Sequence, residues 1–248
     1  MLVDSSEVGS AGEVVVTGTR ADHLQHVLTV APGAIVRVGI VDGPRGTGRV
    51  VSSATGAVTL HCAFEAAAPE RPPIDLLLAL PRPKVLRRLW AQLAALGVGR
   101  IILTNAARVE RNYFDTHVVT PACFRPLLLE GLQQVRDTRL PVVTVHRRLK
   151  VLLEDELGAL AGDAVRLVAD PDDRVSMTKV VEAHGGERLL IAVGPEGGWT
   201  DFERQLFERL GFRRVGLGPR ALRSDTACVA LLALAHDAIA RRHHGCLD

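Results

Sequence analysis

Short apolar runs alternate with helical patterns through most of this chain, and that alternation constrains its fold more than any other feature. From Ile74 onward the apolar runs lack strict polar alternation, which suits parallel strands covered on both faces. The expected strands are 74–80, 100–105, 141–145, 165–170, 188–193 and 213–218, and the expected helices are 84–96, 121–136, 148–157, 175–184, 200–210 and 222–242. This order predicts an α/β domain built on a mostly parallel sheet.

The first part of the chain has a different rhythm. β-branched runs at 13–18, 34–41, 48–53 and 57–64 are separated by turn signals, with one helical pattern at 20–28. The segment AAAPERPP at 66–73 has no periodicity and marks a boundary. We therefore expect a small β domain over residues 1–70 and the α/β domain over 71–248.

Composition limits the class of protein and its compartment. Of the 248 residues, 47% are hydrophobic, enough to form a proper core. No apolar stretch has the length and lack of charge of a membrane span, and no signal peptide is expected. The cysteines Cys62, Cys123, Cys228 and Cys246 form no C-x-x-C pair. We expect a cytoplasmic protein with reduced thiols and no metal site.

Charge is unevenly distributed along the chain. Residues 82–150 carry 13 basic and 4 acidic side chains, a net charge of +9, whereas 1–72 and 151–248 are net acidic. A concentrated basic face is typical of proteins that bind a phosphate backbone. The alternative is an ordinary solvated face of a helix.

Two Gly-Pro turns mark the ends of the last two expected strands. The first is IAVGPEGGWTDFE (191–203) and the second is VGLGPRALRSDTA (215–227). In the first, Thr200 and Glu203 form a capping-box pattern that begins the next helix directly after the turn. Because ligands of parallel α/β sheets bind at the carboxyl ends of strands, both loops are expected to line a ligand site. Plain helix-capping turns are the alternative.

A dinucleotide-binding motif is a weaker interpretation of the second turn. Residues 216–221 match G-x-G-x-x-A after a strand and before a helix. No further strand is expected after that helix, so nothing would carry the acidic residue that binds ribose. A dinucleotide-dependent oxidoreductase therefore stays the less favoured enzyme class.

The two turns also carry a family resemblance. LLIAVGPEGGWTDFE (189–203) and VGLGPRALRSDTACVALLAL (215–234) resemble the C-terminal signature of the bacterial methyltransferases that modify N3 of a uridine in 16S ribosomal RNA, the RsmE family of the SPOUT class. HLQHVLTVAPGAIVRV (23–38) is similar to the family's PUA-like barrel, and LLEGLQQVRDTRLPVV (128–143) to its central segment. The sequence departs from the family pattern at Thr29 and around 81–96. A divergent subfamily with another target nucleotide is an alternative.

The resemblance implies a fold, a cofactor and partners. The fold is a SPOUT-type α/β domain with a trefoil knot, preceded by a small PUA-like β-barrel. The cofactor is S-adenosylmethionine, the substrate is small-subunit ribosomal RNA, and the assembly is a homodimer. A non-catalytic RNA-binding module that keeps the fold is the alternative to an enzyme.

The resemblance also implies the site residues. The expected cofactor-binding residues are Gly194, Pro195, Glu196, Gly197, Gly198, Leu217, Gly218, Pro219, Leu222, Arg223, Ser224, Thr226 and Ala227. A loop near Asp170 and Pro171 is expected to join them. Because uracil N3 carries a proton, the site must remove it or stabilise the resulting anion. Arg223 is the candidate for holding an oxygen of that anion. Glu196 and Asp225 are the catalytic candidates for accepting the proton, or alternatively for orienting the amino group of the cofactor.

Overall fold

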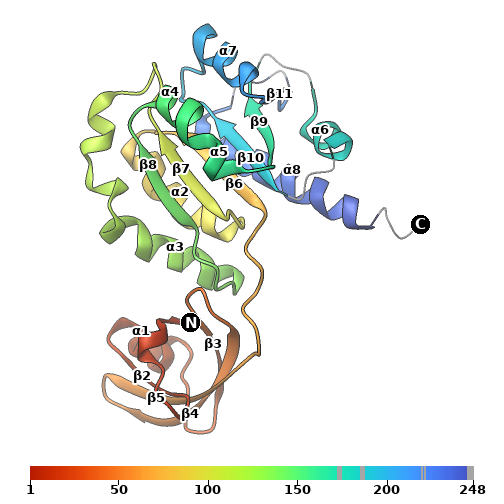
Figure 1. The fold of residues 1–248 in the computed structure, drawn as a ribbon. Coiled ribbons are helices and arrows are strands. Elements are labelled where there is room, and N and C mark those ends of the chain that lie inside the picture. Colours follow the sequence, from red (N-terminus) through yellow and green to blue (C-terminus); the bar gives the residue numbers. More distant parts are fainter. Residues whose placement is uncertain (172–174, 185–187, 219, 221, 245–248) are drawn as a thin grey trace. The chain divides into compact units, whose positions relative to one another are not determined.

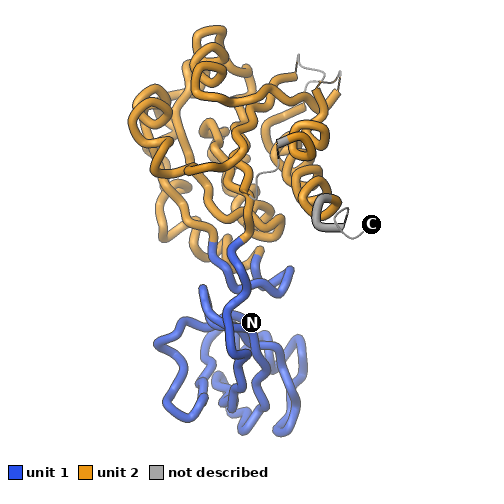
Figure 2. Tube along the Cα trace, turned by 45° about the vertical axis from the view of Figure 1, so that its right-hand side comes forward, with its two compact units in different colours: residues 1–71, 132–140 blue, residues 72–131, 141–248 orange. Residues whose placement is uncertain are grey.

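The chain forms two compact units, which are coloured separately in Figure 2. A computed structural model describes residues 1–171, 175–184, 188–218, 220 and 222–244. Unit 1 contains residues 1–71 together with 132–140, and unit 2 contains residues 72–131 and 141–248. Periodicity along the chain gives no sign that 132–140 belongs with the first unit.

Unit 1 is a small five-stranded sheet. Its strands are β1 (Leu2–Val3), β2 (Glu13–Thr17), β3 (Ile35–Ile40), β4 (Arg45–Ala54) and β5 (Ala57–Phe64), in the order β1-β3-β4-β5-β2. All pairs are antiparallel except β1 with β3. A helical segment, α1 (Thr19–Asp22) and η2 (His23–Val27), follows β2. The four longer strands and the helical segment match the expected ranges, whereas the short strand β1 was not foreseen.

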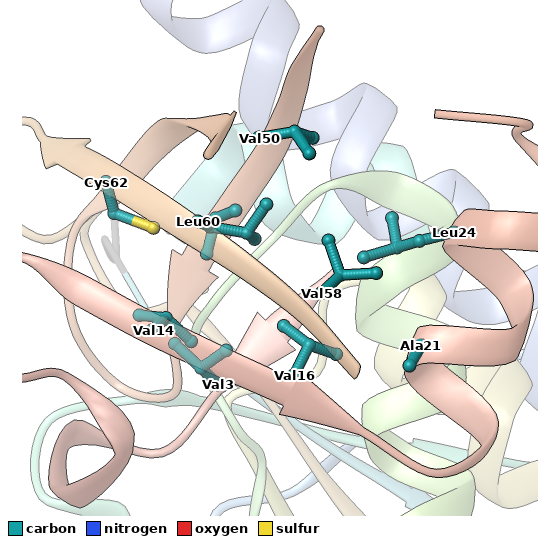
Figure 3. Close-up of a cluster of buried hydrophobic side chains, with 10 residues drawn as sticks. Val3, Val14, Val16, Ala21, Leu24, Val50, Val58, Leu60 and Cys62 are labelled. Atoms are coloured by element: carbon teal, nitrogen blue, oxygen red, sulfur yellow. The ribbon is translucent and has the colours of Figure 1, made fainter. Parts of the chain in front are cut away.

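The inward-facing residues of these strands form one apolar core, drawn in Figure 3. Val16, Val58 and Leu60 are fully buried, as the alternation of apolar and polar residues in β2 and β5 requires. Segment 132–140 is hydrogen-bonded to this unit. Thr138 Oγ1 donates to the carbonyl of Gly43 at 2.6 Å, and Arg71 donates to the carbonyl of Leu140 at 2.7 Å.

Unit 2 is built on a six-stranded sheet whose paired strands are all parallel. Its strands are β6 (Ile74–Ala79), β7 (Arg100–Thr104), β8 (Val142–His146), β9 (Val165–Ala169), β10 (Leu189–Val193) and β11 (Arg213–Val215), in the order β11-β9-β10-β6-β7-β8. The predicted parallel α/β sheet is confirmed. Strands β6 and β10 are buried along their whole length, because helices cover both faces of the sheet (Figure 1).

The helices of unit 2 follow the predicted order. They are α2 (Pro83–Ala95), α3 (Pro121–Val135), α4 (Leu149–Val151), η5 (Leu152–Glu156), α5 (Leu157–Ala161), α6 (Met177–His184), α7 (Asp201–Arg209) and α8 (Ser224–His244). Two short 3-10 helices between β7 and α3, η3 (Arg111–Asp115) and η4 (His117–Val119), were not predicted. In Figure 1, α4 and α5 lie in front of the sheet, and α2 and α8 lie behind it. The last helix begins at Ser224 and not at Leu222 as predicted, so Leu222 and Arg223 belong to the loop before it. No helix in the described part of the chain is long and apolar enough to cross a membrane.

Candidate functional site

A cavity of about 270 Å³ lies at the carboxyl ends of β9, β10 and β11. Both Gly-Pro loops and the loop after β9 line it, so the structure brings together three segments that are distant in the sequence. The predicted residues that line it are Gly194, Pro195, Glu196, Gly197, Gly198, Leu217, Gly218, Leu222, Ser224 and Ala227, with Asp170 and Pro171 from the third loop. Pro219 lies outside the described residues.

Other lining residues were not predicted from the sequence. Trp199 and Arg220 border the cavity, together with the strand ends Val193, Val215 and Ala169. The only feature of the sequence that could have indicated these lining residues is their position directly beside the predicted loops. Arg223, Asp225 and Thr226 are near these residues in sequence, but they do not line the cavity.

Two glycines of the cavity wall are favoured by their surroundings or their backbone conformation. A Cβ atom on Gly194 would approach the Trp199 indole ring to 3.1 Å, tighter than nine in ten real Cβ contacts, so the ring would have to shift slightly. Gly218 has a φ angle of +98°, and a Cβ atom there would meet open space, so the backbone borders the cavity directly. The Gly-Pro-Glu-Gly-Gly turn is closed by a hydrogen bond from the amide of Gly198 to the carbonyl of Pro195 at 2.8 Å.

The cavity wall combines apolar surface with unused polar atoms. Trp199 is 2% exposed and stacks edge-on against Phe207, with ring centroids 4.7 Å apart. Trp199 Nε1 and Ser224 Oγ are buried and have no hydrogen-bond partner among the described residues. Buried polar atoms are usually paired, so these two atoms fit a site whose ligand supplies polar partners.

A buried carboxylate fixes the position of the first loop. Glu203 is 5% exposed, and its Oε2 accepts hydrogen bonds from the amide of Thr200 at 2.8 Å and from the Thr200 hydroxyl at 2.9 Å. The capping box predicted from the sequence is therefore confirmed. The other carboxylate oxygen of Glu203, Oε1, accepts a hydrogen bond from the amide of Ala107 at 2.8 Å. Glu203 thus ties the loop after β7 to the start of α7.

The predicted catalytic residues occupy two different environments. Glu196 lines the cavity, and its carboxylate lies 2.9 Å from Nε of Arg82. Asp225 lies at the start of α8, 3.0 Å from Arg88 and 3.8 Å from Arg223. The Arg223 side chain is 76% exposed. Of the three residues, only Glu196 therefore borders the cavity.

The structure also bears on three other kinds of chemistry: a reactive thiol, a metal site and dinucleotide binding. Desolvation, assisted by the charge of Asp225, raises the pKa of the Cys228 thiol to about 12, so this thiol stays protonated at neutral pH. No group of three or more potential metal ligands occurs among the residues that the structure describes. The dinucleotide interpretation is not supported, because β11, the strand before the second Gly-Pro turn, lies at the edge of the sheet.

We predict that Glu203→Gln lowers the free energy of unfolding by about 1–3 kcal/mol, measured by urea denaturation. The glutamine side chain would keep only one acceptor oxygen, and its NH2 group would face a backbone N–H that now has no acceptor. The matched control is Glu208→Gln on the same helix, where the side chain is exposed, with an expected change within about 0.5 kcal/mol. Equal effects of the two substitutions would remove Glu203 from its anchoring role.

Comparisons with known proteins agree with this geometry. A family model described as an RNA methyltransferase domain matches residues 69–236. The chain is 34% identical over 226 residues to the ribosomal RNA small subunit methyltransferase E of Treponema pallidum, covering 88% of this chain and 84% of that protein. It is 26% identical over 222 residues to the Mycobacterium bovis enzyme of the same name, covering 88% of this chain and 84% of that protein.

A solved structure shares the fold. It is the ribosomal RNA small subunit methyltransferase E from Neisseria gonorrhoeae bound to S-adenosyl methionine, with a TM-score of 0.75, 21% identity and coverage of 94% of each chain. At this identity the likeness establishes the fold alone. The family match and the Treponema relative establish more: the chain belongs to the RNA methyltransferase family that includes ribosomal RNA small subunit methyltransferase E.

Proposed function

We propose that this protein uses S-adenosylmethionine to methylate N3 of a uridine in 16S ribosomal RNA. Family membership supports ribosomal RNA methylation, and the Neisseria relative was crystallised with S-adenosyl methionine bound. The observation that carries the proposal is the cavity shared by the two Gly-Pro loops at the carboxyl edge of the parallel sheet. Because ribosomal RNA is cytoplasmic, this activity implies a cytoplasmic protein.

The cavity fits the proposed cofactor. Backbone groups of the loops at 194–198 and 217–218 would read the edge of the adenine, and Leu217 and Leu222 would pack on its face. Ser224 Oγ and Trp199 Nε1 would gain polar partners that the described residues do not provide. Arg223 and Thr226 stay proposed contacts at the rim, beside the lining residues Ser224 and Ala227.

The protein must align the acceptor base and manage one proton. S-adenosylmethionine, held by the loops at 194–198 and 217–218, would supply an activated methyl group for transfer to N3. Alignment within the cavity is the main contribution of the chain. Glu196 is the proposed acceptor of the N3 proton, because its carboxylate borders the cavity. Arg223 is well exposed, so it is available to hold a uracil oxygen.

Asp225 has a less direct proposed role than Glu196. Its carboxylate is held by Arg88 at 3.0 Å and lies outside the cavity lining. We therefore assign it to fixing the start of α8, which carries the lining residues Ser224 and Ala227. To accept the N3 proton, as the sequence analysis suggests, Asp225 would have to leave its ion pair with Arg88.

Two features of architecture are proposed from the family resemblance. The five-stranded sheet of unit 1, with its single apolar core, is consistent with a PUA-like barrel that contacts RNA. The loops at the carboxyl ends of β9, β10 and β11 lie in the region where the SPOUT class forms its trefoil knot. The domain assignment of 1–70 and 71–248 remains part of this proposal.

Nucleoside mass spectrometry of small-subunit RNA from a deletion strain tests the function. We expect loss of 3-methyluridine and its restoration by the wild-type gene. Loss of another methylated nucleoside would favour a different target, and no change would favour a non-catalytic RNA-binding module. Thermal stabilisation by NAD and not by S-adenosylhomocysteine would instead favour a dinucleotide enzyme.

The proposed cofactor site predicts that Gly218→Val weakens S-adenosylhomocysteine binding at least about tenfold, measured by calorimetry. A branched side chain would enter the cavity at a position where the backbone borders it. Gly211→Val is the matched control, because Gly211 also has a positive φ angle and open space around its Cβ position but lies outside the cavity. Unchanged affinity in folded Gly218→Val would exclude this loop from the site.

A homodimer is proposed from the surface of α8. Leu231, Leu232 and Ala235 are fully buried, but Val229 and Leu234 are 36% and 39% exposed. A helix that is apolar on more than one side is usually covered on more than one side. We expect Leu234→Glu to shift the protein from dimer to monomer in light scattering, whereas Phe202→Glu, at an exposed position on α7, leaves it unchanged. A wild-type monomer with full activity would contradict the proposal.

A further inference from the structure

A second cavity, of about 330 Å³, lies beside the first at the same edge of the sheet. The loops after β6, β7 and β10 line it, through residues 80–82, residues 108–110 with Tyr113, and residues 195–197. The first cavity is lined by the loops after β9, β10 and β11. Because β10 lies between β9 and β6, its loop Pro195–Gly197 forms a wall common to both cavities.

The second cavity has a different chemistry from the first. Its lining includes two arginines, two glutamates and one tyrosine: Arg82, Arg108, Glu110, Glu196 and Tyr113. The wall of the first cavity consists mainly of glycine and apolar residues. Cationic groups beside one aromatic ring are the combination that holds an unstacked RNA base and its phosphate.

The contacts of these side chains orient the Tyr113 ring and leave Arg82 in an ion pair that a ligand could displace. The Tyr113 hydroxyl donates a hydrogen bond to Glu110 Oε1 at 3.0 Å, which fixes the direction of the ring. Tyr113 is the only tyrosine in the sequence. Arg108 donates to the carbonyl of Gly197, within the common wall. The Arg82 and Glu196 side chains are 65% and 35% exposed, and exposed pairs of this kind are weak enough for a ligand to displace.

We propose that this second cavity binds the acceptor uracil, with Tyr113 stacked on the base and Arg82 and Arg108 holding its oxygens or its phosphate. Glu196 borders both cavities. A base in the second cavity with its N3 edge toward the common wall therefore faces the proposed donor site and the proposed proton acceptor together. The inference rests on the proposed function and assigns that function's substrate to particular residues.

Photochemical crosslinking tests the position of the base independently of methyl transfer. The probe is 16S RNA transcribed with 4-thiouridine in place of uridine, bound to the full-length protein saturated with S-adenosylhomocysteine. We expect a crosslink in the peptide that contains Tyr113, and its loss in Tyr113→Leu. Crosslinks confined to other peptides would overturn the assignment.

Kinetics separate stacking from hydrogen bonding. Loss of one base stack corresponds to roughly a ten- to hundredfold effect, so Tyr113→Leu should lower kcat/KM for RNA by that factor. Tyr113→Phe, which keeps the ring, should lose less than about threefold. Arg82→Gln should also lower kcat/KM about tenfold, whereas Lys84→Gln, an exposed residue on α2 outside both cavities, should not.

Calorimetry distinguishes the possible failures. Every variant should bind S-adenosylhomocysteine within about twofold of wild type, since the substituted residues lie outside the first cavity. If wild type methylates the RNA but Tyr113→Leu and Arg82→Gln match it, the second cavity is not the acceptor site and the proposed function stands. If wild type transfers no methyl group to RNA, the proposed function fails, and this inference fails with it.

Discussion

Burial of strand β10 is the constraint on which the rest of this structure depends. Its residues Leu189–Val193 are at most 2% exposed, and the strand is paired in parallel with β9 on one side and β6 on the other. Buried backbone groups must be hydrogen-bonded, so both registers are fixed and the chain leaves the sheet at one defined point. The Gly-Pro-Glu-Gly-Gly loop begins there and separates the two cavities. One buried strand therefore fixes the position of the loop that borders both proposed ligand sites.

Residues from earlier in the chain hold this loop and the start of α8. Glu203 binds the amide of Ala107, Arg108 donates to the carbonyl of Gly197, and Arg88 pairs with Asp225. Preorganised contacts of this kind keep a binding site in shape before its ligands arrive. They also change the interpretation of the basic block 82–150. Several of its arginines bind protein groups, so the net charge of +9 does not describe one free surface for RNA.

Much of the fold was predictable because its signals are local. Apolar runs gave every strand of the parallel sheet, and the Thr200–Glu203 capping box gave the start of α7. The meeting of the two Gly-Pro loops at one cavity was predictable because parallel strands direct their carboxyl-end loops to one edge, whereas the individual lining residues came from the family resemblance. The features that the sequence does not indicate depend on tertiary contacts. The attachment of 132–140 to unit 1 has no local signature, and neither does the ion pairing that separates Asp225 from Glu196.

The most direct test of this account is a structure of the protein bound to S-adenosylhomocysteine and a uridine-containing fragment of 16S RNA. The account predicts the adenosine between the loops at 194–198 and 217–218, and the uracil beside Tyr113 across the wall formed by Pro195–Gly197. The N3 atom of that base should point toward Glu196. A cofactor outside the first cavity, or a base that reaches the cofactor without entering the second, would contradict the central claim.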